Sequence, residues 1–206
     1  HFHASQSSVM CTASDDQQVF VWDISLGNRV RALKQHTREV TSACFVDGHA
    51  YERVVVTSCA DQHVRLWDLR VPSMLRAWSM PMDHRASIAS HGTNHILAAG
   101  IERRVVVWDL RTRCSLQSFD LDRMVNFTGE LTCLAFSPCC SYFAIGSSLG
   151  SVFCINLQSR CTMLTQRHSD AISSLAWGSS WPWRADAAPY LTCASFDSTC
   201  SCWIPS

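Results

Sequence analysis

The stretch VRLWDLR, residues 64–70, decides the fold because the chain repeats it. It returns as VVVWDLR at residues 105–111, and a related stretch, VFVWDIS, occupies residues 19–25. Two further stretches, GSSLGSVFCINL and SFDSTCSCW, end in a comparable way. One position marks the five units at intervals of 45, 41, 47 and 48 residues, occupied by Trp22, Trp67, Trp108, Ile155 and Trp203. Such a period indicates one supersecondary unit per repeat.

Within each unit the residues have the pattern of β-strands. Residues 40–46 and 63–69 alternate between apolar and polar side chains, and residues 54–60 are rich in β-branched ones. Residues 60–62, Ala-Asp-Gln, have the composition of a tight turn. A fourth short run follows at the interior junctions, at residues 29–33, 74–78, 115–119 and 161–165. No long window has a helical period, so the sequence predicts an all-β repeat chain.

The units resemble WD40 repeats over essentially all 206 residues. In that family a histidine before the innermost strand, a Ser or Thr on the second strand, an Asp in the next turn and the Trp form a hydrogen-bonded set. The resemblance therefore implies structural hydrogen-bond sets in three units. Their members are His36, Thr57, Asp61 and Trp67 in the second unit, His168, Cys193, Asp197 and Trp203 in the fifth, and Thr12, Asp16 and Trp22 in the first.

Two units depart from this pattern. In the third, Ala98 and Glu102 occupy the Ser/Thr and Asp places, so we expect a broken set. In the fourth, Ile145, Leu149 and Ile155 occupy all three of the Ser/Thr, Asp and Trp places. Replacing a whole buried polar set with apolar groups is nearly neutral, whereas removing half of it is costly. The fourth unit is therefore expected to be a sound, hydrophobic blade.

The resemblance implies one WD40-type β-propeller region, residues 1–206, with about five four-stranded antiparallel blades. Their expected limits are residues 1–35 (partial), 36–80, 81–121, 122–166 and 167–206, the last without its outer strand. The first unit opens at Phe2, near the end of its innermost strand. The expectation is an incomplete, C-terminal part of a seven-bladed ring, and a complete five-bladed ring is the alternative.

The composition argues against several classes of protein. A net charge of zero disfavours nucleic-acid binding, and no run of 18 apolar residues would span a membrane. The 12 cysteines include no CxxC pair and mostly lie in apolar runs, which favours reduced thiols and a cytoplasmic or nuclear protein. His91 and His95 are the nearest ligand-like pair, but no zinc spacing accompanies them. We expect neither a metal nor a cofactor.

Thr57, His36 and Asp61 have the ingredients of a hydroxyl–imidazole–carboxylate catalytic triad. The set recurs approximately in the fifth unit. A structural set recurs from unit to unit, whereas a catalytic site needs one exposed nucleophile. The sequence therefore favours a non-enzyme, and an enzyme or metal protein on the same fold is the less favoured alternative.

Surface recognition is the remaining class, and the family resemblance also implies it. Trp181, Trp183 and Arg184, within the connection 178–189, are candidate partner-binding residues because Trp and Arg are frequent in interface hot spots. Arg70 and Arg111 end two WDLR boxes. Such paired boxes resemble those of substrate receptors that dock on the adaptor of the cullin-4 ubiquitin ligase. The hypothesis is a scaffold for protein–protein interactions, with ligase receptor as its sharpest version.

Overall fold

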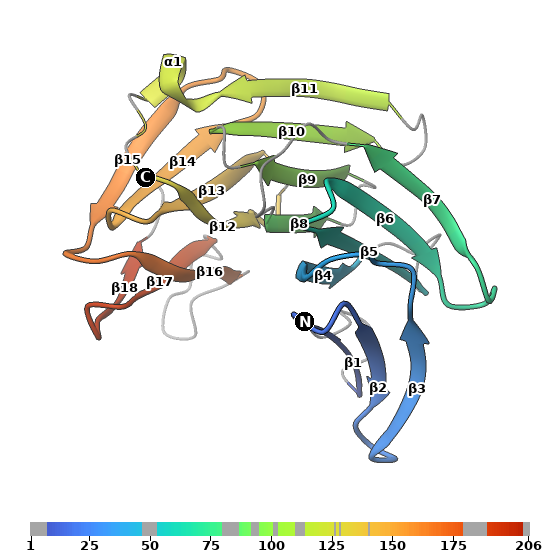
Figure 1. Ribbon diagram of the computed structural model, residues 1–206. Coiled ribbons are helices and arrows are strands. Elements are labelled where there is room, and N and C mark those ends of the chain that lie inside the picture. Colours follow the sequence, from blue (N-terminus) through green and yellow to red (C-terminus); the bar gives the residue numbers. More distant parts are fainter. Residues whose placement is uncertain are drawn as a thin grey trace. The chain divides into compact units, whose positions relative to one another are not determined.

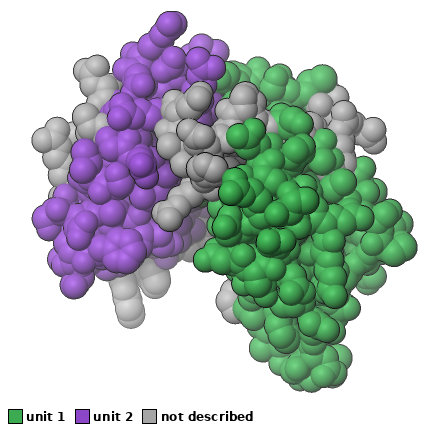
Figure 2. Space-filling model, viewed as in Figure 1, with its two compact units in different colours: residues 1–102, 106–118 green, residues 103–105, 119–206 purple. Residues whose placement is uncertain are grey.

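The chain forms five antiparallel β-sheets, each built from strands that follow one another along the sequence (Figure 1). The computed structural model describes residues 8–46, 53–79, 87–91, 95–100, 103–109, 114–125, 127, 129–139, 141–178 and 189–203. Contacts between residues divide the chain into two compact units, residues 1–102 with 106–118, and residues 103–105 with 119–206 (Figure 2). Every structural statement below concerns the described residues.

The first two sheets lie in the first unit. The first sheet has the order β1-β2-β3, with β1 Val9–Ala13, β2 Val19–Asp23 and β3 Asn28–Leu33. The second has the order β4-β5-β6-β7, with β4 Val40–Phe45, β5 Val54–Cys59, β6 His63–Asp68 and β7 Met74–Ser79. The third, β8-β9-β10-β11, consists of β8 Ser87–His91, β9 His95–Gly100, β10 Arg104–Asp109 and β11 Cys114–Asp120.

The last two sheets lie in the second unit. The fourth sheet contains β12 Leu131–Phe136, β13 Tyr142–Ser147, β14 Ser151–Asn156 and β15 Thr162–Arg167. The fifth contains β16 Ile172–Gly178, β17 Tyr190–Ser195 and β18 Cys200–Trp203. The expected all-β chain of four-stranded antiparallel units is therefore confirmed in the second, third and fourth sheets. Phe2 and the other residues before Ser8 lie outside the described residues, as do those after Trp203.

A short helix, α1 Leu121–Val125, leads into the fourth sheet and was not expected from the sequence. Five residues are too few to display a helical period. Leu121 is completely buried, and its backbone N–H donates to the carbonyl oxygen of Arg103. Burial of this one leucine, rather than an amphipathic pattern, explains why the chain turns here.

The second sheet is buried on both faces, which explains why all six residues of β5 are buried. Val55 belongs to a core cluster with Val21 of β2 and Trp67. Val54 and Val56, on the opposite face of the strand, belong to another cluster with Ile88 of β8, and Trp108 packs against it. The second unit has its own cluster, which joins Val152 of the fourth sheet to residues of β16 and β17.

The turn between the second and third strands of the repeat contains one residue with a positive φ in all five sheets. The angles are 69°, 65°, 59°, 79° and 65° at Gln17, Gln62, Arg103, Gly150 and Ser198. Only one of the five is glycine. Side chains rarely adopt this region. Its recurrence indicates that these five residues hold equivalent places in the five repeats, including the third and fourth, whose sequences depart most from the pattern.

Candidate functional site: buried polar sets and exposed turns

In the second sheet a single hydroxyl joins three of the four expected residues. Thr57, on β5, is completely buried. The indole Nε1 of Trp67, on the adjacent strand β6, donates to Thr57 Oγ1 at 2.9 Å. His36, which precedes β4, places its Nε2 2.8 Å from the same oxygen. The hydroxyl therefore ties the entry of the innermost strand to the two strands beside it.

Asp61, the fourth residue of this set, does not bond His36. Its carboxylate accepts hydrogen bonds from both terminal nitrogens of Arg65, at 2.9 and 2.7 Å, and from Thr37. Both side chains of this ion pair are 8% exposed. The buried Nδ1 of His36 has no hydrogen-bond partner among the described residues. Arg65 therefore pairs with the Asp61 carboxylate, which in the expected set would bond His36.

Burial and the ion pair set the protonation of these groups. Burial, and secondarily the positive charge of Arg65, lowers the pKa of His36 from 6.5 to about 4, so the imidazole is neutral at pH 7. Burial alone would raise the pKa of Asp61, but the hydrogen bonds from Arg65 and Thr37 outweigh it and hold that pKa well below 3.8. The pair is therefore ionised beside a neutral ring.

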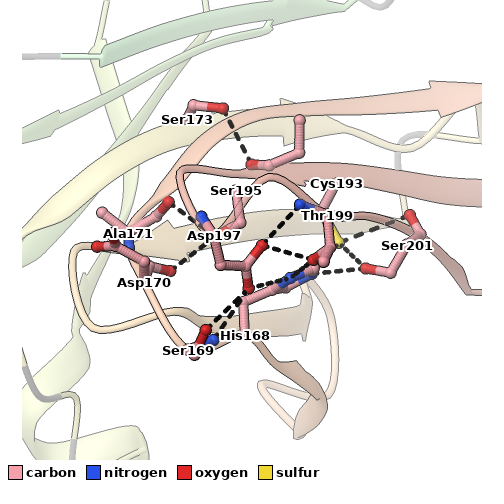
Figure 3. Close-up of polar contacts among 11 residues, drawn as sticks. His168, Ser169, Asp170, Ala171, Ser173, Cys193, Ser195, Asp197, Thr199 and Ser201 are labelled. Atoms are coloured by element: carbon pink, nitrogen blue, oxygen red, sulfur yellow. Dashed lines mark hydrogen bonds and ion pairs between the residues drawn. The ribbon is translucent and has the colours of Figure 1, made fainter.

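The fifth sheet uses the same places with a different set of bonds (Figure 3). His168 Nδ1 lies 3.1 Å from Asp197 Oδ2, and His168 Nε2 lies 3.3 Å from Cys193 Sγ. Ser201 Oγ, at 2.6 Å from His168 Nε2, also contacts Cys193 Sγ. Register explains the difference, because Ser201 pairs with Cys193 as Arg65 pairs with Thr57. Without an arginine there, the aspartate bonds the histidine.

Asp197 also fixes the turn that contains it. It accepts the backbone N–H and the hydroxyl of Thr199, at 2.9 and 2.5 Å, and the N–H of Ser169 at 3.0 Å. The hydrogen bond from the Thr199 hydroxyl is the largest cause that lowers the pKa of Asp197. Trp203, the last expected member, packs against the core cluster of β16 and β17.

The first sheet retains the indole–hydroxyl pair. Trp22 Nε1 donates to Thr12 Oγ1 at 3.0 Å. Asp16, in the following turn, accepts the backbone N–H of Gln18. The third sheet gives less information, because the side chain of Ala98, on β9, and all of Glu102 lie outside the described residues. Trp108 packs against the core shared by the second and third sheets.

In the fourth sheet the side chains at the two strand positions of the set are apolar and buried, whereas the side chain at the turn position is exposed. Ile145 and Ile155 are completely buried, whereas Leu149 is 60% exposed. The interpretation of Leu149 as a member of a buried apolar set was therefore wrong. The missing member is Phe127, which is 1% exposed and packs against Phe153. Its spacing could have revealed it, because it precedes its strand by four residues, as His36 does.

In the fifth set the thiol, imidazole and carboxylate lie in the order of a cysteine hydrolase triad, which raises the question of whether this set is catalytic. Cys193 is only 2% exposed, and its sulfur is 2.7 Å from the hydroxyl of Ser201. A substrate could not reach this sulfur without opening the sheet. The arrangement is suited to joining strands rather than to attacking a substrate.

The aspartates of the first two WD dipeptides, Asp23 and Asp68, organise the turns after them. Asp23 accepts the backbone N–H groups of Ser25 and Leu26, and Asp68 accepts that of Arg70 at 2.9 Å. The guanidinium of Arg70 donates hydrogen bonds to the carboxylate of Asp68 from Nε, at 2.9 Å, and from one terminal nitrogen, at 2.6 Å. The Arg70 side chain is nevertheless 60% exposed. Hydrogen bonds from Arg70 are the main cause that lowers the pKa of Asp68.

A second arginine holds this turn from the neighbouring sheet. Arg31, on the outer strand β3, donates to the carbonyl oxygen of Leu69 at 2.5 Å and to that of Val71. Arg70 is therefore presented on a turn that is fixed from two sides. Arg111 lies outside the described residues, as do Trp181, Trp183 and Arg184.

The described part of the chain contains no helix long and apolar enough to cross a membrane. Within the same residues, no three or more His, Cys, Asp or Glu side chains are grouped so that they could hold a metal ion.

Comparison with known proteins agrees with this geometry. The family model "WD domain, G-beta repeat" matches residues 27–68 and 122–156. WD repeat-containing protein 37 of Xenopus laevis is 31% identical over 118 residues, which are 56% of this chain and 23% of that protein. The guanine nucleotide-binding protein subunit beta of Zea mays is 28% identical over 141 residues, 64% of this chain and 37% of its own length.

A third relative, the F-box/WD repeat-containing protein sel-10 of Caenorhabditis elegans, is 30% identical over 111 residues, 52% of this chain and 18% of that protein. The chain thus spans well under half the length of these curated relatives. Together with the recurring sheets and the left-handed turn residues, these matches show that the chain contains WD40 repeats, with residues 27–68 and 122–156 matching the family model.

Proposed function

We propose that the chain is a non-catalytic scaffold that binds other proteins in a multiprotein complex. One observation carries the proposal: the groups that could do chemistry are buried and bonded to one another, whereas the turns expose side chains suited to binding. Thr57 and Cys193 are buried inside their sheets. Ile24, Leu26 and Phe196, on turns, are 46%, 70% and 70% exposed. Loops on a rigid scaffold commonly carry binding.

In this proposal the partners are proteins, and neither a metal, a cofactor nor a nucleic acid takes part. The cytoplasm or the nucleus is the proposed location.

Site-specific photocrosslinking in cells that express the chain tests the proposal. A photoreactive amino acid at Leu26 or Leu149, both on exposed turns, is expected to capture a small set of discrete proteins. The same group at Ser115, which is exposed on the outer strand β11, serves as the matched control. Equal labelling from all three positions would refute a scaffold role for the turns.

We further propose a narrower version, in which the chain docks on the adaptor of a cullin-4 ubiquitin ligase through Arg70 and Arg111. The exposed, pre-oriented guanidinium of Arg70 supports it. Purified chain is expected to bind the purified adaptor, and Arg70→Ala with Arg111→Ala to abolish the binding. Undiminished binding of the double variant, or no binding by the unmodified chain, would eliminate this version and leave the broader proposal intact.

A further inference from the structure

Two turns of the second unit expose large apolar side chains that the repeat does not require. Leu149 is 60% exposed and Phe196 is 70% exposed. The other turns provide an internal comparison. Where the fourth sheet has Leu149, the first, second and fifth have Asp16, Asp61 and Asp197. Where the fifth has Phe196, the second has Ala60, so the fold is built at these places without large apolar groups.

The two turns are neighbours, because both bond the same segment, residues 168–171. The N–H of His168 donates to the carbonyl oxygen of Gly150 at 2.8 Å. The N–H of Phe196 donates to the carbonyl oxygen of Ala171 at 2.9 Å. Figure 3 shows this segment beside Asp197, whose carboxylate accepts the N–H of Ser169. The turns that carry Leu149 and Phe196 therefore adjoin the same short segment.

Hydrogen bonds hold the backbone of both turns in place before any partner binds. Asp197 fixes the turn of Phe196 through its bonds to Thr199 and Ser169. Ser148, beside Leu149, donates its N–H to the carbonyl oxygen of Glu130 at 2.8 Å and accepts the N–H of Glu130 through its hydroxyl. Pre-organised apolar groups bind with a smaller loss of conformational entropy than mobile ones.

The segments that adjoin the two turns carry acidic side chains. Glu130 and Asp170, on these segments, are exposed. The four contacting segments, residues 129–130, 147–150, 168–171 and 195–199, contain no Lys or Arg, and the only ring that could become cationic, that of His168, is 5% exposed. A complementary partner therefore carries positive charge.

We infer that Leu149 and Phe196, with Glu130 and Asp170 at their rim, form a docking surface for a partner protein's peptide segment that combines an apolar anchor with adjacent Lys or Arg. We name it the Leu149–Phe196 surface. The inference rests on the proposed scaffold function and specifies the partner of one surface. An acidic segment or a second copy of this chain is the competing occupant.

A displayed library of random peptides, selected on the full chain, tests the inference. The selected peptides are expected to contain an aromatic or aliphatic residue within a few positions of Lys or Arg. Leu149→Asp with Phe196→Ala, which restores residues found in other turns, is expected to weaken their binding by about tenfold or more. Because these replacements exist elsewhere in the repeat, the melting temperature serves as the control and should not fall.

The charge is tested separately with Glu130→Gln and Asp170→Asn. These variants are expected to weaken binding by about threefold to tenfold at low salt and to reduce its salt dependence. Selection of acidic peptides, or equal binding to the Leu149–Phe196 double variant, would overturn the inference. So would a dimer in light scattering that the double variant converts to a monomer.

Failure here can be separated from failure of the scaffold proposal. If Leu26 crosslinks discrete proteins and Leu149→Asp with Phe196→Ala leaves the peptide binding unchanged, only the Leu149–Phe196 surface is rejected. If the turns crosslink nothing above the Ser115 control, the scaffold proposal itself is rejected.

Discussion

Thr57 shows how one hydroxyl can join three parts of a sheet. It accepts the indole N–H of Trp67 and contacts the Nε2 of His36, and no part of it reaches solvent. Buried polar groups that lose their partner cost more than the bond itself contributes. The stability of the second sheet therefore depends strongly on this side chain.

We predict that Thr57→Val, which keeps the shape but removes the hydroxyl, lowers the free energy of unfolding by about 1–3 kcal/mol. The reason is that the indole N–H and the imidazole both lose their partner. Urea unfolding followed by tryptophan fluorescence measures the effect. Thr12→Val is the matched control, because among the described residues the Thr12 hydroxyl bonds Trp22 alone, at a partly buried site, and it should cost less. Equal losses in both variants would contradict this role of Thr57.

At the residue scale, the sequence predicts which residues lie together better than it predicts which of their atoms form hydrogen bonds. His36, Thr57 and Trp67 come together as the repeat implies, because spacing fixes which residues share a face. The partner of Asp61 could not be read from the motif, since it depends on Arg65, a residue outside the motif that is buried beside it. Phe127 was missed because a phenylalanine in the histidine place carries no motif signal, although its spacing does.

At the element scale, the recurring turns are held in a left-handed conformation that most side chains tolerate poorly. Gln62, Arg103 and Ser198 adopt it in three sheets, and Gly150 adopts it in the fourth. Glycine reaches this region without steric cost. Hydrogen bonds such as that from the N–H of His63 to Asp61 hold the non-glycine turns in place.

We predict opposite effects from exchanging the residue type at this place. Gly150→Ala should destabilise the chain by more than about 1 kcal/mol, because a Cβ there would collide with the carbonyl oxygen of His168 and lie 2.8 Å from that of Asp170. Gln62→Gly should be neutral or stabilising by up to about 1 kcal/mol, because it relieves the left-handed strain. Thermal unfolding of both variants measures the pair, and a stabilised Gly150→Ala would contradict the described turn.

The positions of the strands could be predicted from hydrophobic alternation and from the period of the repeat, whereas the four-stranded antiparallel sheets were implied by the family resemblance. The helix α1 could not, because it is one turn long and is held by the burial of Leu121. The alternation also understates the burial of β5, whose two faces contact different clusters. A residue pattern describes one strand at a time, whereas burial on both faces requires knowledge of the neighbouring sheets.

At the scale of the whole molecule, the buried polar sets make the fold sensitive to acid. The pKa of His36 is about 4 in the folded chain and 6.5 in the unfolded chain. The unfolded chain therefore binds the proton first, and the stability due to neutral His36 is complete above pH 6.5 and is lost as the pH falls toward 4. Asp61, whose folded pKa is also lowered, adds a second loss below its ordinary value of 3.8.

We predict that the free energy of unfolding decreases by about 2 kcal/mol between pH 6.5 and pH 4 through His36. Urea titrations at a series of pH values measure the slope. His36→Gln, which cannot titrate, should remove this part of the slope while leaving that of the other groups. A variant with the same slope as the unmodified chain would show that His36 does not control it.

Arg31 has a consequence for how this protein can diverge over evolution. It reaches the carbonyl oxygens of Leu69 and Val71, atoms that every amino acid possesses. The junction between these two sheets therefore survives almost any mutation of residues 69–71 that preserves the path of the main chain. Selection can rewrite the side chains at this corner, Arg70 included, without loosening the scaffold beneath them.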